Sequence, residues 1–250
     1  MAGQTYEVDL GDDDLLPPWS TVFEVVGATD AETWVLVGGL MVQLHARRAG
    51  VPPPRPTKDV DVVIDVVSKK TTAGSIAAQL SAIGFEPVTP RTKSAAMYRF
   101  RRGADQVDIM VPDHLPRWVM SRLRGYPAFE APAGEQAIRR RDSYVLTTTA
   151  AGTFTVQVPD SLGALVAKGA AHIVDNRDSG RHLQDGAVLL ASVESVGAMN
   201  LTTLSANDRK RLRHLVAELP DAVPAWDLLG AEDRRRGQKN RERLVIAARL

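Results

Sequence analysis

The sequence predicts an α+β fold, in which a mixed β-sheet domain with flanking helices is followed by a helical domain. Up to residue 158, short runs rich in Val and Ile alternate with segments of helical spacing, as in a mixed sheet covered by helices. From Pro159 onward the pattern is helical. We therefore expect a flexible leader at 1–18, a sheet domain at 19–158 and a helical domain at 159–250.

The elements of the first domain follow from residue spacing and turn residues. Apolar residues at helical spacing predict helices at 19–30, 40–48 and 72–83. Gly84 suits the end of the third helix. Short apolar runs predict strands at 34–37, 58–67, 85–88, 97–102 and 106–111. Gly103 and Ala104 suit a tight hairpin between the last two strands.

Residues 113–158 are less regular. Strands at 144–148 and 153–158 are expected to pair across a turn at 150–152. Pro159 and Asp160 suit the start of a helix. Helices are expected near 160–175, 180–197, 205–218 and 231–248.

Composition limits the possible functions. The chain has 250 residues, 44% hydrophobic and 24% charged, which is enough for a globular protein with a sizeable core. The absence of cysteine excludes disulfides, thiolate metal sites and a cysteine nucleophile. Residues 1–18 carry acidic residues and no Lys or Arg, unlike a secretory signal, and no apolar run could span a bilayer. We therefore expect a cytoplasmic protein without a membrane partner.

Basic residues cluster locally, although the formal net charge is only +1. Two clusters fall in the predicted helical domain: Arg209, Lys210, Arg211 and Arg213, and then Arg234, Arg235, Arg236, Lys239, Arg241 and Arg243. Such clusters could bind a polyanion such as RNA, or could be solvated helix faces.

Acidic residues inside predicted strands are the strongest candidates for chemistry. Asp59 and Asp61 are two residues apart, so a strand places both carboxylates on one face. Taken alone, such a pair is more often a strand end that faces water. Asp108 lies in another apolar strand and completes a three-carboxylate cluster if the two strands are neighbours. Such a cluster can hold two Mg²⁺ ions, which suits the displacement of pyrophosphate from a nucleotide.

Two further motifs, a glycine pair and a lysine, fit a nucleotide-binding site but also have plain structural explanations. Gly38 and Gly39 end a strand and open a helix, whose backbone N–H groups could bind phosphate, although a plain tight turn is equally consistent. Lys168 lies among apolar residues of a helix, where a surface lysine with its stem on apolar groups is an equal alternative.

Together these motifs resemble those of the polymerase-beta-type nucleotidyltransferase superfamily. The matching residues are Val37-Gly38-Gly39, His45, Arg55-x-Thr57-x-Asp59-Val60-Asp61 and Asp108. Two later segments more specifically resemble the AbiEii/MenT-type nucleotidyltransferases, the toxins of bacterial toxin–antitoxin pairs. They are Pro159-Asp160-Ser161-Leu162 through Lys168, and Arg181-His182-Leu183-Gln184-Asp185.

This resemblance implies a nucleotidyltransferase-type sheet domain and Mg²⁺-dependent transfer of an NMP from an NTP to an acceptor hydroxyl, with RNA and the tRNA 3′ end favoured. It implies that Asp59 and Asp61 bridge two metal ions and that Asp108 holds the ion that activates the hydroxyl. Gly38, Gly39 and Thr57 would bind the phosphates. Lys168 would stabilise the triphosphate charge, and Asp185 would orient Lys168 or the acceptor. A cognate antitoxin would be the protein partner.

Two other interpretations remain open from the sequence. One is nucleotidyl transfer to a small molecule or a protein. The other is a non-catalytic nucleotide-binding or interaction module on the same fold, since a fold does not fix a function. The presence of all three acids together with Lys168 favours an enzyme.

Overall fold

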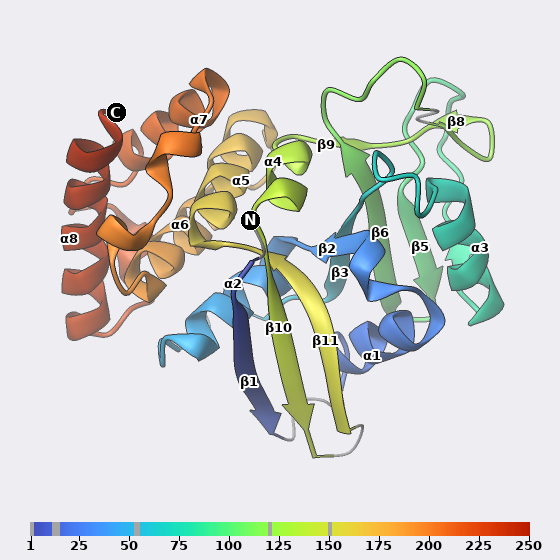
Figure 1. Cartoon of the computed structure of the whole chain (residues 1–250), viewed down its shortest axis with the longest axis horizontal. Helices are drawn as coiled ribbons and strands as arrows, with labels where there is room; N and C mark the ends of the chain where they lie inside the picture. The colour runs from blue at the N-terminus through green and yellow to red at the C-terminus, as the bar shows by residue number, and fades with distance from the viewer. Residues whose placement is uncertain (1–2, 12–15, 53–55, 120–121, 150–151) are drawn as a thin grey trace. The chain divides into compact units, whose positions relative to one another are not determined.

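The computed structural model describes residues 3–11, 16–52, 56–119, 122–149 and 152–250 (Figure 1). The chain divides into a sheet unit, Met1–Leu40 with Thr57–Pro159, and a helical unit, Met41–Pro56 with Asp160–Leu250. The predicted α+β class is confirmed. The units differ from the expected domains because residues 41–56 group with the helices rather than with the sheet.

The sheet unit is built on a six-stranded mixed sheet. Its main path is β2 (Trp34–Leu36), β3 (Asp59–Ile64), β6 (Asp105–Pro112), β5 (Arg99–Arg102) and β4 (Glu86–Pro87), with β9 (Glu130–Ala131) also paired to β6. Strands β3 and β6 are parallel, and the other neighbours along the path are antiparallel. Helix α3 (Ala73–Ala82) packs against β6. Both β3 and β6 are therefore interior strands, with a paired neighbour on each side.

The two faces of this sheet differ in polarity. One face is apolar and fully buried: Trp34, Leu36, Val60, Val62, Ile64, Phe100, Val107 and Ile109. The alternating residues form the opposite face, because successive side chains of a strand point to opposite sides. That opposite face is apolar around Val35 and Val63 and polar around Asp61 and Asp108.

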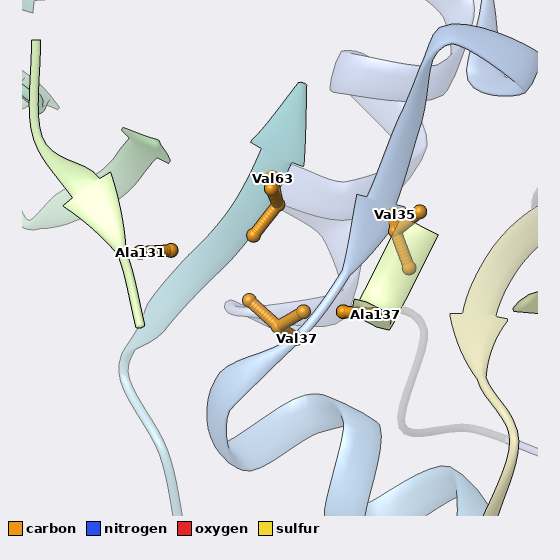
Figure 2. Close-up of a cluster of buried hydrophobic side chains, with 5 residues drawn as sticks. All are labelled: Val35, Val37, Val63, Ala131 and Ala137. Carbon is orange, nitrogen blue, oxygen red and sulfur yellow. The ribbon is translucent and has the colours of Figure 1, made fainter. Parts of the chain in front are cut away.

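A small cluster covers the apolar end of the opposite face. Val35, Val37 and Val63 pack with Ala131 and Ala137 (Figure 2). Ala137 comes from helix α4 (Gly134–Arg139), which the irregular sequence of this region did not predict. The cluster anchors β2 and β3 directly beside the acidic residues of β3.

A second sheet ties the N-terminal residues to later strands. Strand β1 (Thr5–Gly11) pairs in parallel with β10 (Arg141–Thr148), which pairs in antiparallel with β11 (Gly152–Pro159). The expected flexible leader at 1–18 is therefore not found at 5–11. Val8 and Leu10 are buried, and the acids that alternate with them face outward. Positions 1–2 and 12–15 of that leader, Arg55, and residues 150–151 of the expected turn lie outside the described residues.

Helix α1 and several short elements complete the sheet unit. Helix α1 (Trp19–Ala28) packs against β11, where the rings of Phe23 and Phe154 meet edge to face with centroids 4.0 Å apart. The remaining short elements are the β7–β8 pair (Arg122–Leu123 and Tyr126–Pro127) and a 3₁₀ helix at Ala31–Thr33.

The helical unit contains four further helices as well as most of α2 (Gly38–Arg48). They are α5 (Ser161–Val174), α6 (Gly180–Ser192), α7 (Ala206–Ala217) and α8 (Ala231–Ala248), joined by 3₁₀ helices at Val196–Ala198, Leu201–Thr203 and Pro224–Trp226. Asp160 caps α5 by accepting from the Gly163 N–H at 2.6 Å. A Cβ at Gly169 would collide with the Arg211 carbonyl, so this glycine permits the close approach of α5 and α7. None of the described helices is long and apolar enough to cross a membrane.

Candidate functional site

The three acidic residues selected from the sequence lie together on the polar end of the sheet face. In the parallel pair of β3 and β6, Asp61 is the direct partner of Asp108, and Asp59 is the partner of Gln106. Paired residues and residues two apart point to the same side of a sheet. Asp59, Asp61 and Asp108 therefore share one face, with the first two half-buried and Asp108 only 6% exposed.

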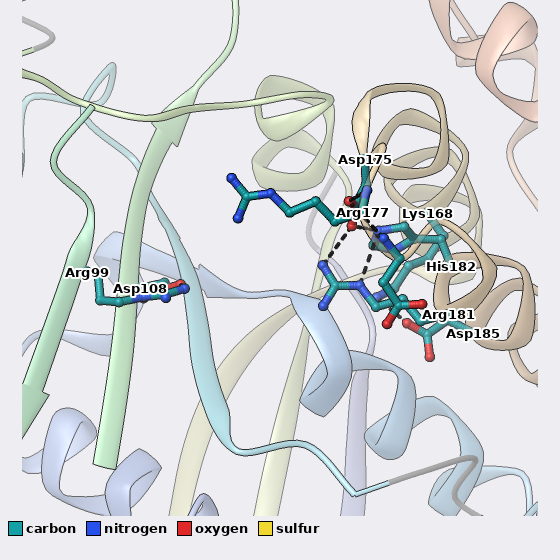
Figure 3. Close-up of polar contacts among 9 residues, drawn as sticks. Arg99, Asp108, Lys168, Asp175, Arg177, Arg181, His182 and Asp185 are labelled. Carbon is teal, nitrogen blue, oxygen red and sulfur yellow. Dashed lines mark hydrogen bonds and ion pairs between the residues drawn. The ribbon is translucent and has the colours of Figure 1, made fainter. Parts of the chain in front are cut away.

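Asp108 is held by an arginine from the strand on its other side. Arg99 is the direct partner of Asp108 in the antiparallel pair of β5 and β6 (Figure 3). Its Nε donates to Oδ1 at 3.0 Å and its Nη2 donates to Oδ2 at 2.8 Å, so the contact is bidentate. The buried Asp108 carboxylate is therefore paired with the Arg99 guanidinium through two parallel hydrogen bonds.

A second arginine lies two residues further along β5, on the same face of the sheet. Arg101 donates to Gln106 Oε1 from Nε at 3.2 Å and from Nη2 at 3.0 Å. Gln106 in turn donates from Nε2 to Asp108 Oδ2 at 3.4 Å. Asp108 thus receives three N–H donors from two residues on its own face.

The electrostatics of Asp108 reflect competing causes. Burial raises the pKa of its carboxyl, the Arg99 fork opposes that rise, and the nearby Asp59 charge adds to it. The hydrogen bonds to Asp108 raise the pKa of Arg99 above its ordinary value, so the guanidinium stays charged. Asp59 also acts on Arg99 electrostatically, which places all three groups in one charged neighbourhood.

The glycine pair packs directly against two of the motif residues. Gly38 has a φ of +69°, and a Cβ on it would collide with Oδ2 of Asp61. A Cβ on Gly39 would lie 2.9 Å from Oγ1 of Thr57. Only glycines therefore allow the start of α2 to lie against these two side chains. This contact brings the N-terminus of α2, Thr57 and Asp61 into one place. The free N–H groups at a helix start can bind phosphate.

Of the three acidic residues on this sheet face, two are suited to bind a hard divalent cation and the third is less suited. Asp59 and Asp61 offer carboxylate oxygens, which Mg²⁺ prefers, and both are half-buried rather than sealed. Asp108 offers less, because Arg99 and Gln106 already donate to it. Within the described part of the chain, no group of three or more His, Asp or Glu side chains has the arrangement of a metal site.

In the helical unit, the two residues selected from the sequence form a buried ion pair. Lys168 Nζ on α5 lies 2.7 Å from Asp185 Oδ2 on α6 (Figure 3). The two residues are 4% and 0% exposed. The alternative of a surface lysine therefore does not hold for Lys168. Burial of two charges carries a desolvation cost that can equal the gain from pairing, so stability alone does not account for this pair.

His182, also on α6, belongs to a neighbouring polar group. Its Nε2 lies 3.0 Å from Asp175 Oδ2, and its buried Nδ1 has no hydrogen-bond partner among the described residues. Burial, aided by the Lys168 charge, lowers the pKa of His182 to about 4, although Asp175 opposes the shift. His182 is therefore neutral at pH 7. Asp175 accepts from the Arg177 N–H at 2.9 Å, and chiefly for that reason its pKa lies well below the ordinary value.

A pocket of about 430 Å³ lies within the helical unit. Its lining includes His172, Asp175, Lys210 and His214, but neither Lys168 nor Asp185. His172 Nδ1 and His214 Nε2 are 2.7 Å apart, which joins α5 to α7. Burial, with a further contribution from His214, lowers the pKa of His172.

Arg99 is the residue of the sheet site that sequence analysis missed, although a signal for it was present. The turn predicted at Gly103 and Ala104 pairs Arg102 with Asp105. Moving away from the turn one residue at a time along both strands then pairs Arg99 with Asp108. The hairpin register therefore contained the contact, but it emerges only when the pairing is extended from the turn to Arg99.

Comparisons with known proteins found a matching family model and a similar solved structure. A family model described as "Nucleotidyl transferase AbiEii toxin, Type IV TA system" matches residues 22–243. Among solved structures, the chain is similar to an antigenic nucleotidyltransferase-like protein from Paracoccidioides brasiliensis. The two are 20% identical, with a TM-score of 0.48, over 82% of this chain and 90% of that chain. No curated protein matches the chain.

Proposed function

The chain belongs to the AbiEii family of nucleotidyl transferase toxins, and from that premise we propose that it moves an NMP from an NTP to an RNA hydroxyl with the help of Mg²⁺. Membership of this family makes the chain a nucleotidyltransferase of toxin–antitoxin type. The acceptor proposed is the 3′ end of tRNA, and the protein partner proposed is a cognate antitoxin.

One observation carries the proposal: Asp59, Asp61 and Asp108 share one sheet face beside the start of α2. Asp59 and Asp61 are proposed to hold Mg²⁺. Bound there, Mg²⁺ would supply Lewis-acid stabilisation of the negative charge that develops on the phosphates. Asp108 stays beside these residues as a fixed carboxylate, in the position that the Arg99 fork gives it.

The start of α2 is proposed to bind the phosphates of the NTP. The first N–H groups of a helix have no partner within the helix and carry a partial positive charge. Gly38 and Gly39 lack side chains that would block an approach to these groups. Thr57 lies against Gly39, and its hydroxyl is a further donor for a phosphate oxygen.

Lys168 and Asp185 are proposed to serve the same reaction, as the family resemblance implies. A lysine ammonium is a compact charge suited to the triphosphate. The 2.7 Å contact with Asp185 fixes the position of Nζ, so its orientation is set before substrate binds. This role, rather than stability, would explain why the chain holds such a costly buried pair.

RNA as the acceptor is supported by exposed cations on two helices. Lys210 and Arg213 are exposed on α7, and Arg235, Lys239 and Arg243 are exposed on α8. The three on α8 are four residues apart in turn and so form one stripe along the helix. A stripe of this kind can follow a phosphate backbone, and binding through it should weaken as salt rises.

The test is a labelling reaction with the purified protein, Mg²⁺, total RNA and each α-labelled NTP in turn. Label on RNA of tRNA size supports the proposal. Label on a protein, or on a small molecule such as an added hydroxyl compound, would assign a different acceptor to the same chemistry. The matched control is Asp59→Asn, which keeps the size of the side chain, removes its charge and should give no label.

A further inference from the structure

The hydrogen-bonding capacity of Asp108 is largely used by its protein partners. An ionised carboxylate has about four lone-pair positions for donors or metal ions. Three N–H groups already point at Asp108, two from Arg99 and one from Gln106. Both oxygens are engaged, and the residue is 6% exposed. A metal ion could use Asp108 only by displacing the arginine or by sharing oxygens with it.

Charge is also ordered across the face from strand to strand. Asp61 on β3, Asp108 on β6 and Arg99 on β5 are successive register partners. Asp59, Gln106 and Arg101 form the parallel row beside them. Asp59 and Asp61 therefore lie on β3, the strand that approaches Gly38, and the cationic side of the face is on β5.

The Arg99 fork is suited to act as a permanent cation. A guanidinium stays charged at all physiological pH values, and its planar pair of N–H donors matches the two carboxylate oxygens. Breaking the contact would leave a buried carboxylate without a counter-charge, which is costly. Gln106 adds a third, longer contact, with its Nε2 3.4 Å from Asp108 Oδ2.

We propose that Arg99 takes the place of a second metal ion at Asp108, so that the site holds one divalent cation, on Asp59 and Asp61, instead of two. This inference rests on the proposed function, because it assumes that Asp59 and Asp61 bind a cation. It departs from the sequence expectation, in which Asp108 was itself a metal ligand. Arg99 becomes a positioning residue, which fixes Asp108 and supplies positive charge on that side of the face.

The test counts bound metal directly. Mn²⁺ replaces Mg²⁺, and equilibrium dialysis with the α,β-methylene analogue of each of the four NTPs gives the Mn²⁺ bound per chain. Wild type should bind about one Mn²⁺, where a two-metal site would bind about two. Asp108→Asn should also bind about one, and Asp59→Asn should bind none. Arg99→Ala frees Asp108 and should raise the count to about two.

Arg101→Ala is the matched control, because it removes an arginine from the same strand and face without unpairing Asp108. Its count should stay at about one. Arg99→Lys tests the same point if Arg99→Ala does not fold, since it keeps a charge but loses the fork, and its count should also exceed that of wild type.

Two outcomes would overturn the inference while leaving the proposed function intact. One is about two Mn²⁺ on wild type, falling to about one in Asp108→Asn. The other is no gain of Mn²⁺ in folded Arg99 variants. A wild type that binds no Mn²⁺ with any of the four analogues would instead count against both the inference and the metal-dependent function from which it follows.

Discussion

Lys168 and Asp185 neutralise each other inside the helical unit, with Nζ and Oδ2 2.7 Å apart and side chains 6% and 1% exposed. Each residue therefore makes two separable contributions. One is to the folded state, because a lone charge there would be unpaired and buried. The other, under the proposed function, is to the reaction. Variants that remove one charge and variants that remove both should separate these contributions.

Removal of one partner should destabilise the fold strongly. In Asp185→Ala the Lys168 ammonium stays buried without a counter-charge, so the free energy of unfolding should fall by about 3–5 kcal/mol. The double variant Lys168→Met/Asp185→Leu replaces the pair with apolar groups and should recover most of that loss. Urea denaturation followed by circular dichroism measures both. A double variant as unstable as Asp185→Ala would contradict this prediction.

The folded double variant should nevertheless transfer nucleotides poorly. Loss of one preorganised charged donor costs about 2–4 kcal/mol of transition-state stabilisation, which is a rate about 30- to 1,000-fold lower. The labelling reaction measures the rate at saturating NTP. A folded double variant with the wild-type rate would assign the pair a structural role only.

Asp59→Asn should lose ligand binding without losing stability. The substitution removes one of several neighbouring negative charges, so the metal-free protein should melt no lower than wild type. Mg²⁺ with NTP at about 100 times its dissociation constant should stabilise wild type by about 2.7 kcal/mol and Asp59→Asn hardly at all. Thermal melts with and without ligand measure this. Glu7→Gln, an exposed acid-to-amide change on β1, is the control. Equal stabilisation of wild type and Asp59→Asn would remove the support for nucleotide binding through Asp59.

Gly38→Ala should disturb Asp61 as well as the backbone. Gly38 has a φ of +69°, and a Cβ there would collide with the Asp61 carboxylate. Gly50→Ala is a matched control, because Gly50 has a φ of +66° but no atom within 4 Å of an added Cβ. Both should lose about 1–2 kcal/mol of stability from backbone strain. Only Gly38→Ala should also lose the stabilisation by Mg²⁺ and NTP. The prediction fails if the two variants respond alike to ligand.

Stability should depend on pH through His182. Its pKa is about 4 in the folded chain, against an ordinary value of 6.5, because burial and the Lys168 charge disfavour the imidazolium. Between these values the unfolded chain binds more protons than the folded one, so the free energy of unfolding falls as pH drops from 6.5 to 4. The loss should be on the order of 2–3 kcal/mol.

His182→Gln isolates this contribution, since it keeps a donor for Asp175 and cannot titrate. His172 also has a lowered pKa, but it remains in both proteins and cancels in their difference. Asp175 loses its contribution only at lower pH, because its pKa is depressed. Urea denaturation at several pH values should therefore show a shallower slope for His182→Gln. Parallel curves would mean that His182 titrates normally.

Much of the fold and the acidic part of the site could be predicted from the sequence, because both rest on local periodicity. The two-residue spacing of Asp59 and Asp61 fixes their shared face whichever strands lie beside them. Helices α5, α7 and α8 begin and end close to the expected residues for the same reason. Strand β1 alternates in the same way, although residues 1–18 are expected from the sequence to form a leader.

What could not be predicted depends on contacts between distant residues. The burial of Lys168 requires α6 to bring Asp185 against α5, and no residue pattern on α5 alone distinguishes a buried lysine from an exposed one. Helix α4 is short and has few apolar residues, so its sequence alone gives little helix propensity. Its stability comes mainly from packing against Val35 and Val63. The Arg99 contact required the hairpin register to be extended by several residues.

The length of the turn between β5 and β6 has a consequence for how this chain can vary. Exposed turns usually tolerate inserted and deleted residues. Here the two-residue turn, Gly103 and Ala104, sets the register that pairs Arg99 with Asp108 and Arg101 with Gln106. A loop of another length favours another register, and a shift of one residue sends every side chain of the strand to the opposite face. Natural relatives that keep this site should therefore differ in the identity of residues near the turn but not in their number, and an epitope tag inserted there should be far more damaging than one inserted at the exposed Gly50.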